Sequence, residues 1–191
     1  MPRRLLLVLT FIAAALDVSS VYADVIEARN VSVVQGDDAL VVGADFGFEL
    51  TQRLEEALNH GVALYFVVEC ELVRPRWYWF DEKTATAKLT LRLVYHTLSR
   101  QYRVSRGALY QNFATLEEAL RTLGTVRDWA VAEREHLKPE EGYIASLRMR
   151  LDPTQLPKPF QVSAFVSREW TLASDWTRVA FTANLAGSAA R

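Results

Sequence analysis

The residues of this chain that could do acid–base or metal chemistry are few and scattered. Glu69 and Glu71 are two residues apart on a predicted strand, so their carboxylates would share one face, as a general acid and a general base would. Glu133 and His136 have the spacing of two metal ligands on a helix face, but a dimetal site of that kind needs a second such pair, which the sequence lacks. For both pairs we favour the alternative, a solvated charged face.

Sequence motifs of known catalytic sites are absent. The chain has no Gly-x-Ser-x-Gly, Ser-x-x-Lys or His-Glu-x-x-His motif and no glycine-rich phosphate loop. Its three histidines, His60, His96 and His136, are far apart in the sequence. We therefore expect no enzyme, no cofactor and no metal, with a hydrolase that uses no recognisable motif as an alternative.

The chain has one cysteine, Cys70, so no disulfide can form within it. Cys70 continues an alternation of apolar residues that runs from Val62 to Leu72. Because alternate residues of a strand share one face, this pattern predicts a buried, structural cysteine rather than a reactive thiol.

The most unusual segment is 74–82, Arg-Pro-Arg-Trp-Tyr-Trp-Phe-Asp-Glu. In an extended chain, Trp77 and Trp79 point to one side, and Tyr78 and Phe80 to the other. Exposed tryptophan beside arginine is typical of the hot spots of protein interfaces, and it would also suit stacking against sugar rings. The alternative is that one aromatic face fills the core while a helix or the proline-rich connection covers the other.

A second cluster lies between Tyr95 and Val104, where Ser99-Arg100-Gln101 predicts a tight hairpin turn. This turn would expose Arg100 beside further arginines, and together with segment 74–82 it would form a basic, aromatic surface for an acidic partner or anionic head groups. Arginines scattered over a half-polar sheet are the alternative. The candidate interaction surface consists of Arg74, Arg76, Trp77, Trp79, Arg100, Tyr102 and Arg103.

Residues 1–23 predict a cleavable signal peptide. Arg3 and Arg4 are followed by an apolar run over residues 5–16 and then by Val21-Tyr22-Ala23, the pattern of a cleavage site after Ala23. The apolar run is shorter than the roughly 20 residues that cross a bilayer, so we expect a periplasmic protein with no stable transmembrane segment after cleavage.

Removal of residues 1–23 leaves 168 residues, of which 20 are basic and 22 acidic. This size predicts one globular domain over residues 24–184, followed by a disordered tail over 185–191. The near-neutral balance argues against nucleic acid as a partner, because phosphate binding needs a basic face.

Apolar residues alternate with polar ones along most of the chain, which is typical of antiparallel strands with one buried face. The clearest predicted strands are 40–48, 62–72, 87–95 and 145–151, and the weaker ones are 25–34, 102–110, 160–166 and 176–183. The pattern predicts a mainly β protein, a two-layer antiparallel β-sandwich with two short helices. An α+β fold, with the helices on one face of an antiparallel sheet, is the alternative.

The two predicted helices, 51–59 and 115–124, both contain Leu-Glu-Glu-Ala-Leu. Thr51 and Thr115 are suited to cap them, and glycines follow or end them. Residues 126–137 fit either an extension of the second helix or a short strand that ends in a charged loop. The prolines from Pro153 to Pro159 predict an extended connection.

Several of these segments, in this order, resemble one family, the uncharacterised proteobacterial domain of unknown function 4390. The resemblance rests on 74–82, on Tyr-His-x-Leu-Ser-Arg-Gln-Tyr-Arg-Val at 95–104, on the helix at 116–120, on Leu-Asp-Pro-x-Gln-Leu-Pro-Lys-Pro-Phe at 151–160 and on Trp-x-Leu-Ala-Ser-Asp-Trp at 170–176. It implies an exported protein of Gram-negative bacteria, encoded beside a membrane sensor kinase, and it supplies no catalytic residues.

These observations together predict a non-enzymatic periplasmic interaction module whose protein partner is the external part of a sensor kinase. The alternative is a binding protein for a small ligand, glycan or lipid, with an apolar slot lined by Trp77, Trp79, Trp170 or Trp176.

Overall fold

The computed structural model describes residues 26–78, 80–167 and 170–184. The predicted signal peptide with its cleavage site, Trp79 and the predicted tail 185–191 lie outside the described residues.

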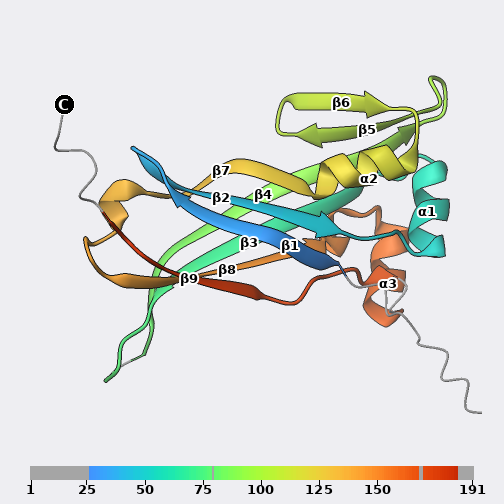
Figure 1. The fold of residues 1–191 in the computed structure, drawn as a ribbon. Coiled ribbons are helices and arrows are strands. Elements are labelled where there is room, and N and C mark those ends of the chain that lie inside the picture. Colours follow the sequence, from blue (N-terminus) through green and yellow to red (C-terminus); the bar gives the residue numbers. More distant parts are fainter. Residues whose placement is uncertain (1–25, 79, 168–169, 185–191) are drawn as a thin grey trace, which may run out of the picture.

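The described chain forms two antiparallel sheets packed face to face (Figure 1), which confirms the predicted β-sandwich. The small sheet has the order β1-β2-β7, with β1 at Glu27–Gln35, β2 at Ala39–Gly47 and β7 at Thr125–Glu133. The large sheet has the order β6-β5-β4-β3-β8-β9. Its strands are β3 (Leu64–Arg74), β4 (Glu82–His96), β5 (Gln101–Arg106), β6 (Leu109–Phe113), β8 (Gly142–Leu151) and β9 (Thr177–Thr182).

Three α-helices gather at one end of the sandwich, and the turn between β3 and β4 projects from the other end (Figure 1). Each predicted helix begins at its predicted cap: Thr51 accepts a hydrogen bond from the Leu54 N–H, and Thr115 accepts one from the Glu118 N–H. The α-helices are α1 (Gln52–Asn59), α2 (Leu116–Gly124) and α3 (Lys158–Val166), and short 3₁₀ turns lie at η1 (Arg134–His136) and η2 (Pro153–Gln155).

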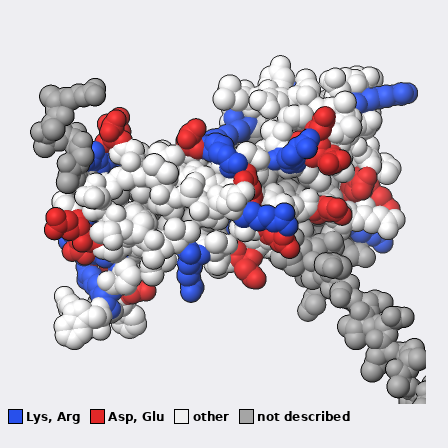
Figure 2. Space-filling view, viewed as in Figure 1, with Lys and Arg blue, Asp and Glu red and all other residues white. Residues whose placement is uncertain are grey.

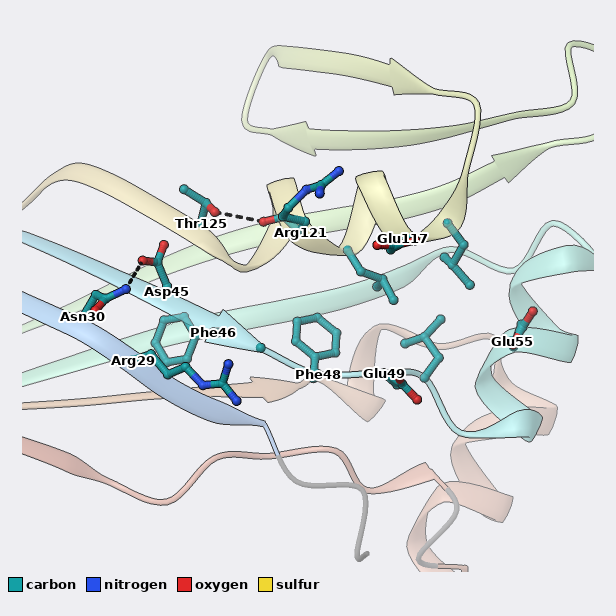
Figure 3. Close-up of a pocket in the computed structure, with 14 residues that line it drawn as sticks. Arg29, Asn30, Asp45, Phe46, Phe48, Glu49, Glu55, Glu117, Arg121 and Thr125 are labelled. Atoms are coloured by element: carbon teal, nitrogen blue, oxygen red, sulfur yellow. Dashed lines mark hydrogen bonds between the residues drawn. The ribbon is translucent and has the colours of Figure 1, made fainter.

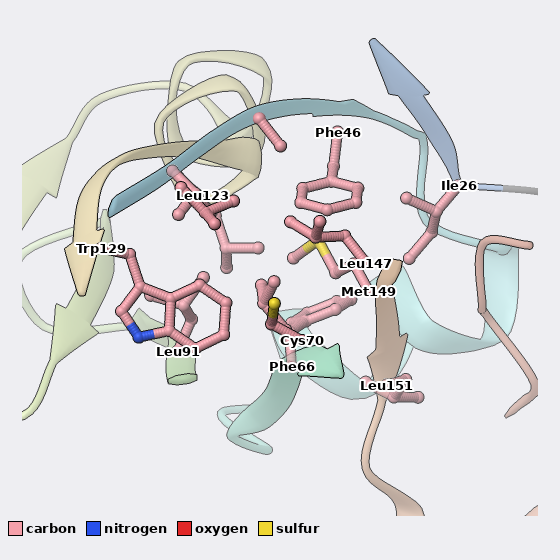
Figure 4. Packing of buried hydrophobic residues seen from close by; sticks show 14 of the residues in the cluster. Ile26, Phe46, Phe66, Cys70, Leu91, Leu123, Trp129, Leu147, Met149 and Leu151 are labelled. Atoms are coloured by element: carbon pink, nitrogen blue, oxygen red, sulfur yellow. The ribbon is translucent and has the colours of Figure 1, made fainter. Parts of the chain in front are cut away.

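The core lies between the facing sides of the two sheets (Figure 4). Phe66 and Cys70 of β3, Trp129 of β7 and Met149 of β8 are all buried there. Full burial of an apolar side chain of this size contributes about 2 kcal/mol, so the alternating pattern seen in the sequence is the main source of stability.

The segment after α2 shows why the chain turns where it does. Gly124 ends α2, and β7 starts at the next residue and pairs with β2. A Cβ atom on Gly124 would lie 2.0 Å from the carbonyl oxygen of Phe46, so only glycine allows the helix to pack this close to β2.

Three local predictions differ from the structure or are decided by it. Residues 102–110, predicted as one strand, form the hairpin β5–β6, because Gly107 adopts a left-handed φ of 58° at the turn. Residues 160–166 form helix α3 rather than a strand. The connection predicted to be extended is instead the 3₁₀ turn η2, followed after two residues by the start of α3 at Lys158. Residues 125–133 form strand β7, which decides between the two predictions for that region.

The reason for the error at α3 lies in its prolines. The carbonyl oxygen of Pro157 accepts hydrogen bonds from the N–H groups of Phe160 and Gln161, so Pro157 and Pro159 stand at the helix start, where proline needs no N–H partner.

Candidate functional site

The turn between β3 and β4 exposes a cluster of large aromatic side chains, which we call the aromatic tip: Trp77, Tyr78 and Phe80. These side chains are 93%, 68% and 86% exposed, respectively. The rings of Trp77 and Tyr78 meet edge to face, with their centroids 5.0 Å apart. The alternative, in which one aromatic face fills the core, is therefore wrong for these three residues. Trp79 lies outside the described residues.

The base of the aromatic tip is fixed by ion pairs. Arg74 is the last residue of β3 and pairs with Glu82, the first residue of β4. Arg74 Nε donates to Glu82 Oε2 over 3.1 Å. Arg76 also pairs with Glu82, and Arg74 Nη1 lies 3.0 Å from Glu141 Oε1. Hydrogen bonds from Arg74 and Arg76 lower the pKa of Glu82.

These contacts change the interpretation of the two arginines. The side chain of Arg74 is only 11% exposed and is surrounded by carboxylates. Arg74 therefore holds the hairpin base together, and it is the aromatic rings that project. In Figure 2 the tip is the white protrusion at the lower left, where Figure 1 places the β3–β4 turn.

The second predicted cluster lies around the β4–β5 turn. Arg100 is exposed in this turn, with φ at 51°. The Tyr102 hydroxyl donates to Asn59 Oδ1 over 3.3 Å, and its ring packs against Tyr95. Arg103 Nε donates to Asn112 Oδ1 over 2.9 Å. Tyr102 and Arg103 thus have structural contacts of their own.

The structure does not bring the two clusters together. Strand β4 begins at Glu82, beside the aromatic tip, and ends at His96, beside the β4–β5 turn. A strand of this length spans on the order of 45 Å. The single basic and aromatic surface expected from Arg74, Arg76, Arg100 and Arg103 is therefore not formed.

Glu69 and Glu71 do share one face of β3, but both carboxylates are engaged in ion pairs. Glu69 is 5% exposed, and its oxygens lie 2.7 Å from Arg148, 3.1 Å from Arg150 and 3.3 Å from Lys88. Burial would raise the pKa of Glu69, but the hydrogen bonds from Arg150 and Arg148 outweigh it and lower the pKa to about 2. A carboxyl group with so low a pKa has already lost its proton near neutrality, so it is a poor general acid there.

Cys70 is buried in the core as predicted. Burial, together with the charge of Glu71, raises the pKa of its thiol to about 12, so little thiolate forms at neutral pH. Within the described part of the chain no group of three or more His, Cys, Asp or Glu side chains could hold a metal ion.

A cleft that the sequence did not predict lies at the helical end of the sandwich, where its volume is about 790 Å³ (Figure 3). The ends of β1 and β2, helix α2 and Glu55 of α1 line it. Glu55 and Glu117 occupy the same position in the two Leu-Glu-Glu-Ala-Leu sequences, and both line the cleft. The apolar lining residues are Phe46, Phe48, Leu50, Leu116 and Leu120.

The tryptophans expected to line an apolar slot lie in different places. Trp170 is buried against Phe160, with ring centroids 5.3 Å apart. Trp176 lies under the guanidinium of Arg148, whose central carbon is 4.4 Å from the ring centroid. Trp77 is at the aromatic tip, so these three residues share no pocket.

No helix in the described ranges is long and apolar enough to cross a membrane. Comparison with curated proteins and with solved structures found no match to the chain. One family model, described as a domain of unknown function, matches residues 23–180. This match covers most of the 191 residues and includes both the aromatic tip and the cleft. The chain therefore belongs to the domain-of-unknown-function family DUF4390.

Proposed function

We propose that this chain is a non-enzymatic interaction module, exported to the periplasm, that binds another envelope protein through its aromatic tip. The observation that carries the proposal is the exposure of Trp77, Tyr78 and Phe80 together at the end of one hairpin. Clustered exposed aromatic side chains of this size are uncommon on a protein surface that contacts only water.

The construction of the hairpin supports a recognition role. The ion pairs of Arg74 with Glu82 and Glu141 hold the two strands at the point from which the rings project. A fixed base reduces the conformational entropy that the tip would lose on binding, and aromatic residues are the commonest hot spots of protein interfaces.

The charges around the tip favour a protein over a lipid surface. Arg74 and Arg76 are paired with carboxylates, and Asp81 adds another negative charge beside them. The tip therefore has no surplus of positive charge, which a loop that binds anionic lipid needs. We infer a partner pocket that is apolar and receives the aromatic rings. The gene neighbourhood implied by the family resemblance makes the external domain of a membrane sensor kinase the first partner to test.

The test is a binding measurement with matched variants. Trp77→Ala and Phe80→Ala remove rings from the tip, while Leu98→Ala removes a side chain that is 102% exposed on the β4–β5 turn. We expect the tip variants to fold normally. Their binding free energy for the partner should weaken by at least about 2 kcal/mol, which is about thirtyfold in affinity. Unchanged affinity in both tip variants would refute the proposal.

The cleft of Figure 3 favours a second candidate function, the binding of a small ligand with an apolar body. Its volume of about 790 Å³ and its phenylalanine and leucine lining are typical of ligand sites. A ligand at one hundred times its Kd would raise the free energy of unfolding by about 2.7 kcal/mol. Thermal shift of the protein with periplasmic small-molecule extracts tests this function, and Leu120→Arg, which places a charge in the lining, should abolish the shift. No shift with any extract would count against it.

A further inference from the structure

The outer face of the large sheet, which is turned away from the core, carries positive charge. In an antiparallel sheet directly paired residues share one face. The partners of Glu69 are Lys88 and Arg148, and the partner of Tyr65 is Arg92, so these residues lie opposite the buried alternation of Phe66 and Val68. The cations on this face are Lys83, Lys88, Arg92, Arg103, Arg148, Arg150 and Arg178.

Few carboxylates balance these charges. Among the described residues whose position in the six strands places them on this face, the carboxylates are Glu69 and Glu71. Glu71 pairs with Lys83 over 2.9 Å, and Glu69 faces Lys88, Arg148 and Arg150. One further carboxylate, Asp152 just after β8, lies 3.8 Å from Arg150, so the cations of this face still outnumber the carboxylates. The whole chain has a net charge of −1, so the positive charge is concentrated here. The side on which the small sheet lies in front carries both signs interspersed (Figure 2).

Aromatic rings hold the arginines of this face in place. Arg92 lies over Tyr65 at 5.9 Å, Arg103 over Tyr110 at 4.4 Å and Arg148 over Trp176 at 4.4 Å, each measured from the guanidinium carbon to the ring centroid. These cation–π contacts orient the guanidinium groups. Arg148 also donates to Glu69, and Arg103 Nε donates to Asn112.

We propose that this face binds a membrane surface of anionic phospholipids. The cations are spread over strands β4, β5, β8 and β9 and none of them lines the cleft of Figure 3, so together they fit a planar array of phosphates rather than one small anion. Tyr65, Tyr110 and Trp176 are of the residue types that are enriched at the membrane interface. The proposal does not depend on the aromatic tip, which lies at the end of β3 and β4.

Vesicle sedimentation of the purified protein tests this proposal, with phosphatidylglycerol and phosphatidylcholine in one sample and phosphatidylcholine alone in the other. We expect binding to the anionic vesicles only, and weaker binding as salt is raised. The variant with Arg92→Gln, Arg103→Gln and Arg178→Gln spares the ion pairs of Glu69. It should reduce the partition coefficient on the order of 100-fold, at about one kilocalorie per mole for each cation.

A matched control separates this face from net charge. Arg29→Gln, Arg53→Gln and Arg121→Gln remove the same charge from exposed positions on β1, α1 and α2, and should leave vesicle binding within about threefold of the unmodified protein. Equal losses in both triple variants, or no binding to anionic vesicles, would overturn the proposal. The protein could also fail to bind vesicles while the Arg92, Arg103 and Arg178 triple variant loses a protein partner that the tip variants retain. That result would overturn the lipid proposal and show that this face binds an acidic protein instead.

Discussion

Arg74, the last residue of β3, and Glu82, the first residue of β4, pair directly beneath the aromatic tip and close the hairpin. This pair explains how three exposed aromatic residues can project from a defined position rather than from a loose loop. The two strands are anchored in the core by Leu72 and its neighbours, so the tip lies at the end of a long hairpin whose base is held by ion pairs.

Glu82→Gln should loosen the base of the tip, because it removes the charge that pairs with both Arg74 and Arg76. The lowered pKa of Glu82 means that its ionised form stabilises the folded state. This stabilisation is present above the ordinary glutamate pKa and is lost as pH falls through the lower pKa of the folded protein. The Tm of the unmodified protein should therefore exceed that of Glu82→Gln at neutral pH and converge with it in acid. Glu135→Gln, at an exposed position, is the control, and an equal Tm difference at every pH would contradict this explanation.

Glu69→Gln should destabilise the protein by about 2 kcal/mol, because Arg148 and Arg150 would lose the charge that they share. Urea unfolding measures this change. The pKa of Glu69 is about 2 in the folded protein, against an ordinary value of 4.5. The contribution of Glu69 to the free energy of unfolding should therefore be fully present above pH 4.5 and be lost as the pH falls from 4.5 to 2.

Glu71→Gln is the matched control for Glu69, since it removes a carboxylate from the same strand and the same face. The Glu71–Lys83 pair is more exposed, so the expected loss is below about 1 kcal/mol. Equal losses in the two variants would show that the cations around Glu69 contribute no special stabilisation.

Gly124→Ala should destabilise the protein by about 3 kcal/mol, because the new Cβ would collide with the carbonyl oxygen of Phe46 and push α2 away from β2. The same change at Gly142, where a Cβ would meet nothing within 4 Å, should have little effect. Chemical denaturation of the two variants measures the difference. A Gly124→Ala protein as stable as the Gly142→Ala protein would mean that the close approach of α2 to β2 is not required.

Most of the sandwich could be predicted from the sequence, because alternation reports directly which face of each strand is buried. Strands around Val42, Phe66 and Leu147 were found in this way, and Thr51 and Thr115 marked the two helices. The alternation failed at Phe160 to Val166, where an apolar segment of helix α3 has the same spacing as a strand. The alternation also continues across the turn at Gly107, so the pattern did not predict that β5 ends and β6 begins there.

The candidate site could be predicted only in part. The composition of segment 74–82 pointed to the tip, but exposure depends on how far the hairpin extends beyond the core. The predicted strand began at Ala87, whereas β4 begins at Glu82. Because the predicted strand was too short, the distance that separates Arg76 from Arg103 was underestimated. The cleft could not be predicted, because residues that line it, such as Glu55 and Glu117, come from helices far apart in the sequence.

The most direct test of the central claim, that the aromatic tip binds a protein, is site-specific photo-crosslinking in intact cells. A photoreactive amino acid would replace Trp77 at the tip or Leu98 at the other end of β4, where the side chain is equally open to solvent. We predict a discrete crosslinked protein from position 77 that is absent from position 98 and is competed by the unmodified protein. Identical crosslinking patterns from the two positions, or none from position 77, would contradict the claim.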